Sequence, residues 1–76
     1  MKIYVNEMEP FRAYGSNMAI AATSNEYILE YSVDGVNWTP HQDPIPAGET
    51  LLVANLAQGM HLRLNGNAEA GVVVLF

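Results

Sequence analysis

The chain has 76 residues, half of them hydrophobic and 14% charged, which excludes a disordered protein and allows one small domain over residues 1–76. Its net charge is −5 with three basic residues, so we expect neither nucleic acid nor an anionic membrane surface as a partner. Cysteine is absent, which excludes disulfides. A domain this small without disulfides is expected to be stabilised as part of an oligomer or a larger assembly.

The N-terminal stretch predicts two short strands. Lys2 to Asn6 alternates, and we expect Ile3 and Val5 to point inward. Phe11 to Tyr14 is expected to form a second strand that ends at Gly15. The first ten residues hold no apolar run, so we expect no signal peptide, and we expect no transmembrane segment anywhere in the chain. The expected place of synthesis is the cytoplasm.

The segment from Met18 to Thr23 fits either a strand or a helix. Alanine and methionine favour a helix, and Ser16 or Asn17 could cap one helical turn. Six residues make a poor helix, and the surrounding sequence is β-like. We therefore expect a strand.

The stretch from Tyr27 to Thr39 predicts a β-hairpin. Residues alternate up to Val33, and Asp34-Gly35 is typical of a tight two-residue turn. In that register Tyr31 faces Trp38 across the hairpin; a bulge at Gly35 would instead slip the register by one residue, so that Trp38 faces Glu30.

The second half of the chain predicts a proline-rich connection and three strands. Residues 40–48 hold three of the four prolines and are expected to cross between two sheets. Strands are expected over 49–56, over 60–64 with Met60, Leu62 and Leu64 inward, and over 72–76. Asn65-Gly66 predicts a turn. In the alternative interpretation, the loop continues up to residue 71.

This pattern predicts an all-β fold, a small antiparallel β-sandwich or barrel of about six or seven short strands. The last segment, VVVLF, is apolar on both of its faces. An exposed apolar edge strand would aggregate, so we expect this strand to be central in its sheet or covered by another subunit.

The sequence offers no constellation for catalysis. A nucleophile, a base and an orienting group are not found together, no glycine-rich phosphate loop is present, and we expect no enzyme and no cofactor. His41 and Asp43 alone do not define a metal site. The carboxylates are expected in turns or on solvent faces, namely Glu30, Asp34, Asp43, Glu49 and Glu69.

The aromatic residues allow two interpretations. Trp38, Tyr27 and Tyr31 form either part of the core, which we favour, or an exposed platform for sugar rings. Tyr4 and Tyr14 are the aromatic residues that we expect to be exposed and to contact a partner.

The stretch from Tyr31 to Thr39 resembles the S-x-D-G-x-x-W hairpin of many β-sandwich modules. Together with residues 45–50 and 62–67, it is similar to small accessory proteins of tailed-phage particles, which are capsid decoration proteins and capsid-binding domains of head fibres. The resemblance covers roughly residues 27–76.

The resemblance implies a non-enzymatic protein of the virion that binds the major capsid protein on the outer capsid surface as a homotrimer. Both ends of the chain are apolar enough to need cover, which makes them the expected contacts. The expected interface residues are Ile3, Tyr4, Val5, Tyr14, Val73, Leu75 and Phe76. The alternative is a carbohydrate-binding or tail-fibre-like receptor-binding module.

Overall fold

The computed structural model describes residues 1–6, 9–41, 43–66 and 71–76. Its described residues form eight short strands and no helix, so the all-β expectation is confirmed and the strand count is slightly higher than expected. The strands are β1 (Lys2–Val5), β2 (Phe11–Arg12), β3 (Met18–Ala21), β4 (Tyr27–Ser32), β5 (Thr39–Pro40), β6 (Leu51–Val53), β7 (His61–Gly66) and β8 (Val72–Leu75). None of the described segments forms a helix with the length and apolar character needed to cross a membrane.

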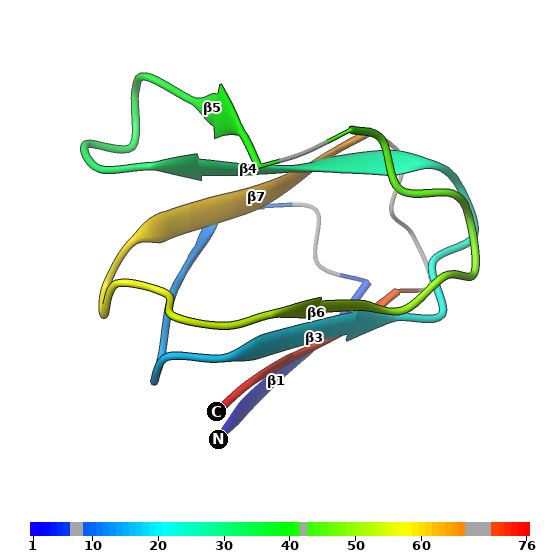
Figure 1. Cartoon of the computed structure of the whole chain (residues 1–76), viewed down its shortest axis with the longest axis horizontal. Coiled ribbons are helices and arrows are strands. Elements are labelled where there is room, and N and C mark those ends of the chain that lie inside the picture. The colour runs from blue at the N-terminus through cyan, green and yellow to red at the C-terminus, as the bar shows by residue number, and fades with distance from the viewer. Residues whose placement is uncertain (7–8, 42, 67–70) are drawn as a thin grey trace.

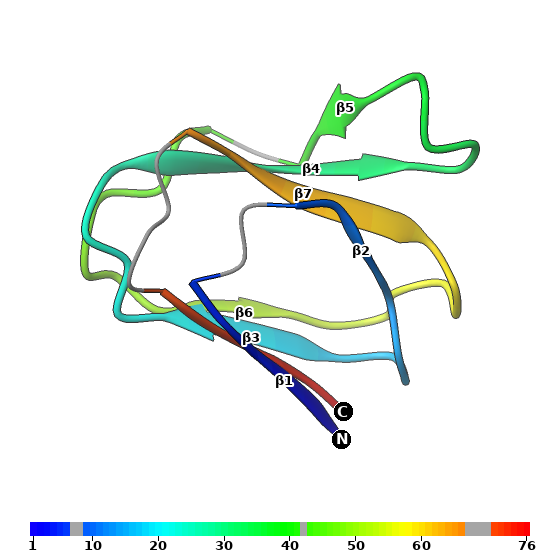
Figure 2. The ribbon, with the colours of Figure 1, turned by 180° about the vertical axis from the view of Figure 1, so that it is seen from behind.

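Two antiparallel sheets face each other and make a β-sandwich (Figures 1 and 2). One sheet has the order β1-β8-β3-β6, and the other has the order β2-β7-β4-β5. The two sheets meet over a core of twelve buried side chains, which are Phe11, Ala13, Met18, Ile20, Tyr27, Leu29, Ile45, Val53, Leu62, Leu64, Val73 and Leu75.

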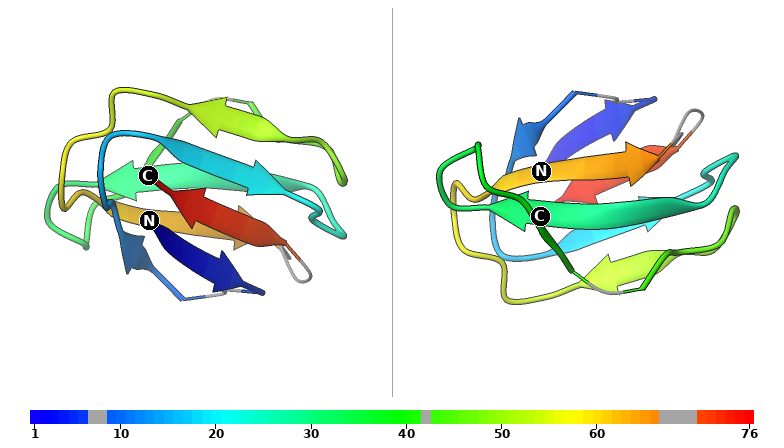
Figure 3. Two further views of the ribbon diagram at one scale, coloured as in Figure 1. Left: turned by 90° about the horizontal axis from the view of Figure 1, so that it is seen from below. Right: turned by 90° about the horizontal axis from the view of Figure 1, so that it is seen from above.

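Strand β8 is central in its sheet, between β1 and β3 (Figure 3). This is the first of the two places expected for the apolar C-terminal segment. Beyond β8, Phe76 and Asn17 exchange two backbone hydrogen bonds of 3.0 Å each. Gly15 lies against this end of the chain with a φ of +77°, and an added Cβ would come within 2.6 Å of the Phe76 carbonyl carbon. Only glycine therefore fits the close approach at position 15.

The ambiguous segment from Met18 is a strand, as expected, because its alternate residues Met18 and Ile20 are buried in the core. The proline-rich connection runs from β5 in one sheet to β6 in the other, as expected. Ile45 anchors it by exchanging two backbone hydrogen bonds with Tyr27, of 2.7 and 3.1 Å. Strand β6 is shorter than predicted, and Asn55 beyond it has a φ of +62°, which ends the extended backbone.

Strand β7 points Leu62 and Leu64 into the core, as its alternation predicts. It continues through Gly66, so Asn65-Gly66 is part of the strand and the predicted turn at these two residues is wrong. The alternative loop over residues 67–70, together with Glu69, lies outside the described residues.

The expected orientation of β1 is wrong. Ile3 and Val5 are 59% and 65% exposed, whereas Tyr4 is half-buried and packs on Phe11 with ring centroids 5.1 Å apart. Tyr4 pairs with Val73, a core residue of β8, and directly opposed residues of an antiparallel pair share a face. The pairing with β8 therefore turns Tyr4 inward and its two neighbours outward.

Candidate binding surface

The outer face of the β1-β8-β3-β6 sheet is apolar across all four strands. The pairing register places Ile3 opposite Val74, Val74 opposite Ala19, and Ala19 opposite Leu52. Directly opposed residues share a face, so these four side chains form one row across the sheet. A second row holds Val5, Val72 and Ala21. We call these seven residues the apolar face.

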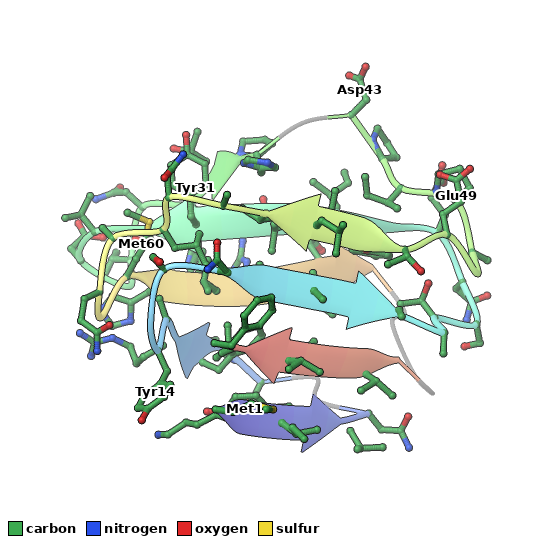
Figure 4. The ribbon with its side chains drawn as sticks, turned by 60° about the horizontal axis from the view of Figure 1, so that its bottom comes forward. Met1, Tyr14, Tyr31, Asp43, Glu49 and Met60 are labelled. Atoms are coloured by element: carbon green, nitrogen blue, oxygen red, sulfur yellow. The ribbon has the colours of Figure 1, made fainter. Side chains whose placement is uncertain are left out.

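Three more apolar side chains extend the apolar face at one end, namely Met1, Tyr14 and Phe76, which are 74%, 43% and 52% exposed. Met1 and Tyr14 lie at the same end of the sheet in Figure 4. The Lys2 ammonium lies 5.6 Å from the centre of the Tyr14 ring, a cation–π contact at the rim. This charge at the border contrasts with the two rows, which contain no charged residue.

The apolar face is large for so small a protein. Leu52 is 74% exposed, more than Ile3 or Val5. Seen from below, the molecule extends 27 by 19 Å between Cα atoms (Figure 3), which bounds a footprint of roughly 500 Å². A contiguous exposed apolar surface on a soluble protein marks an interaction site. The footprint is smaller than the ~800 Å² per partner of a standard interface, so one such contact alone binds weakly.

The expected interface residues divide between the two sides of this sheet. Ile3, Val5, Tyr14 and Phe76 are exposed at the apolar face or its end.

Three other expected interface residues point the opposite way. Tyr4 packs against the core, while Val73 and Leu75 are 2% and 0% exposed and belong to it. Because side chains alternate along β8, burying Val73 and Leu75 turns Val72 and Val74 outward. The expectation that Tyr4, Val73 and Leu75 contact a partner is therefore corrected.

Sequence reasoning missed the contributions of Ala19, Ala21 and Leu52 to the apolar face. Strand β3 buries Met18 and Ile20 and leaves its two alanines facing outward. A strand that is apolar at every position indicates cover on both faces, a signal that β3 shares with β8.

The β4–β5 hairpin has a longer loop than the sequence suggested. Tyr31 pairs with Thr39, so the two-residue turn, the bulged alternative and the Tyr31–Trp38 pair are all wrong. The Asp34 carboxylate explains the difference, because it accepts hydrogen bonds from the backbone amides of Val36 and Asn37 at 2.8 and 2.9 Å. Side-chain acceptors of this kind compete with the cross-strand bonds of a tight turn.

The outer face of the second sheet carries a cation stacked on an indole ring. The Arg63 guanidinium lies 4.3 Å from the centre of the Trp38 ring, and its Nε donates a hydrogen bond of 2.7 Å to Glu30. The Glu30 side chain is only 10% exposed, which corrects the expectation that it is solvated. Arg63 thus satisfies a nearly buried carboxylate and covers one aromatic face.

The aromatic platform of the alternative function does not assemble. Tyr27 is 1% exposed and lies in the core, as the favoured interpretation expected, and Tyr31 packs against the core. Trp38 stands apart from them beside Arg63, so the expectation that it belongs to the core is wrong. A shallow pocket of about 190 Å³ between the sheets has Tyr31 and Met60 in its lining. Figure 4 shows these two residues on the same side of the molecule.

The described residues contain no group of three or more histidine, aspartate or glutamate side chains that could hold a metal ion. His41 lies beside Tyr31, with ring centroids 6.3 Å apart. Comparisons with protein-family models, curated proteins and solved structures find no match to this chain.

Proposed function

We propose that the chain is a non-enzymatic virion structural protein, a capsid decoration protein that binds the outer capsid surface as a homotrimer. The apolar face is the observation that carries this proposal. It needs cover, and it offers apolar surface without a reacting group, which suits association and not catalysis. The trimer and the capsid as partner come from the resemblance of residues 27–76 to phage accessory proteins.

Copies of the same chain are the occupant that we assign to the apolar face. The face is exposed as soon as the chain folds, and a second copy of the chain presents the same apolar surface. Each chain carries a net charge of −5, yet the two rows of the apolar face are uncharged, so copies approach there without charge repulsion across the contact.

Capsid binding is proposed to follow from repetition. One small chain offers the capsid only a weak contact by itself, but three linked copies bind a symmetric surface with a much higher effective affinity. The major capsid protein presents such a repeated surface. The proposed site of action is therefore the capsid surface of the virion, after synthesis in the host cytoplasm.

The test has two stages. Light scattering on the freshly purified chain is expected to give the mass of three copies, and sedimentation with capsids that lack this protein is expected to pellet it. A monomer that remains in the supernatant with capsids would contradict the proposal. Glycan binding detected by Trp38 fluorescence would favour the receptor-binding alternative instead.

A further inference from the structure

The large hydrophobic side chains that are exposed among the described residues fall into two groups. Six belong to the apolar face or its end. The other two are Val33 and Val36, which are 88% and 76% exposed. They flank Asp34-Gly35 at the tip of the β4–β5 loop, which extends from the second sheet (Figure 1). We call Val33 to Val36 the valine tip.

The valine tip is held in one conformation by its own polar groups. Besides the Val36 and Asn37 amides, Asp34 accepts hydrogen bonds from the Ser32 hydroxyl at 2.9 Å and from Asn37 Nδ2 at 2.7 Å. The Ser32 Oγ in turn accepts a hydrogen bond of 2.8 Å from the Gly35 amide. A loop fixed in this way loses little conformational entropy when it binds.

The loop also packs on the sheet beneath it. Gly35 has a φ of +80°, and a Cβ at this position would lie 3.1 Å from the His61 ring. Neither valine contributes to this anchoring or to the core. Two exposed valine side chains on a loop that is braced by Asp34 and Ser32 point to a contact outside the chain.

We propose that the valine tip inserts into an apolar depression on the capsid protein that has a basic side chain at its rim. This inference rests on the proposed function and assigns its capsid contact. Val33 and Val36 supply the apolar surface that is buried. The Asp34 carboxylate between them supplies negative charge. The hydrogen bonds that it accepts within the loop favour its ionised form, and none of their donors is a cationic group.

The division of surfaces follows from their positions. The apolar face belongs to the β1-β8-β3-β6 sheet, whereas the valine tip extends from the opposite sheet (Figure 1). Copies that associate through the apolar face therefore leave their tips uncovered. A trimer presents three tips, and a symmetric partner engages them together.

The decisive variant is Val33→Ser combined with Val36→Ser. It is expected to keep the oligomeric mass and the thermal midpoint, because both side chains are exposed, and to weaken sedimentation with decoration-free capsids at least about tenfold. Ala47→Ser is the matched control, an exposed apolar residue in the β5–β6 connection, and is expected to pellet like the wild type.

Asp34→Ala tests the pre-organised loop, because it leaves both valines in place. We expect weaker capsid binding and a smaller loss of binding at high salt than in the wild type.

The outcomes separate this inference from the proposed function. If the wild-type chain does not pellet with capsids, the proposed function fails and the inference fails with it. If the wild type pellets and the double valine variant pellets equally well, the valine tip is not the contact and the proposed function stands. Wild-type binding by Asp34→Ala, with unchanged salt dependence, would contradict the role of the braced and charged loop.

Discussion

Tyr27 is a buried phenol whose hydroxyl has no hydrogen-bond partner among the described residues. Its ring fills the core at 1% exposure, and its backbone pairs with Ile45, so the position is well packed apart from the hydroxyl. Burial, and secondarily the charge of Glu49, raise the pKa of Tyr27 from 10.0 to about 12. The unfolded chain therefore releases this proton at lower pH than the folded chain does.

Tyr27→Phe is expected to leave stability unchanged or slightly higher at pH 7, because it removes an unsatisfied buried hydroxyl. The wild type is expected to keep its full stability below pH ~10 and to lose about 2 to 3 kcal/mol as the pH rises toward the folded pKa of about 12. Urea unfolding at several pH values between 7 and 12 measures this difference. Parallel stability curves for the two proteins above pH 10 would contradict it.

Asp34 shows where prediction at the residue scale ends. The Asp-Gly pair correctly predicts the reversal of the chain after β4. The length of the loop depends on whether the aspartate side chain accepts local amide hydrogens or leaves them to the opposite strand. Both arrangements suit the same two residues, and the sequence pattern does not distinguish them.

At the scale of elements, Arg63 joins three strands on the outer face of the second sheet. It lies on β7, pairs directly with Glu30 on β4, and stacks on Trp38, which immediately precedes β5. The Arg63 side chain is 36% exposed, so solvent screens part of the ion pair.

Arg63→Ala is expected to lower the free energy of unfolding by about 1 to 2 kcal/mol, since it leaves the Glu30 carboxylate nearly buried without its partner. The fluorescence of Trp38, the only tryptophan, is expected to shift to longer wavelength as water reaches the ring. A cycle with Glu30→Gln isolates the pair and is expected to give a coupling of about 1 kcal/mol. Additive losses together with an unchanged emission spectrum would show that the stack contributes nothing.

The inward face of a strand can be predicted from sequence when one face is apolar and the other is polar. Strand β7 alternates leucine with polar residues, and its inward face was predicted correctly. Strand β1 reads Lys-Ile-Tyr-Val, with three apolar residues in succession, and offers no such contrast. Its orientation depends on the partner strand β8, which lies about seventy residues away in the sequence, and local alternation carries no information on that pairing.

At the scale of the whole molecule, the apolar face exists only in the folded protein. Ile3, Ala19, Leu52 and Val74 come from four separated segments that the sheet order brings into one row. The sequence indicated that its two ends need cover, but it contained no sign that Leu52 adjoins them. The part of the proposed contact that β3 and β6 supply was therefore not predictable from the ends of the chain alone.

Leu52→Asp is expected to convert the oligomer to monomers and to leave the fold intact, because the side chain is 74% exposed and a charge there cannot be buried between copies. Light scattering measures the mass, and circular dichroism verifies the fold. Asn65→Asp, an exposed change in the opposite sheet, is the control and is expected to keep the oligomer. An unchanged mass for Leu52→Asp would place the contact elsewhere.

The central position of β8 also determines when the protein can fold during its synthesis. Strand β1 pairs with β8 alone, and β3 has β8 as one of its two neighbours, so most of this sheet waits for residues 72–75. The sheet can therefore be completed only after residues 72–75 have emerged from the ribosome. Until then, nascent chains hold β1 and β3 without β8 as their partner strand. Arrest of the ribosome before residue 72 should therefore leave a chain that proteases degrade and that chaperones bind.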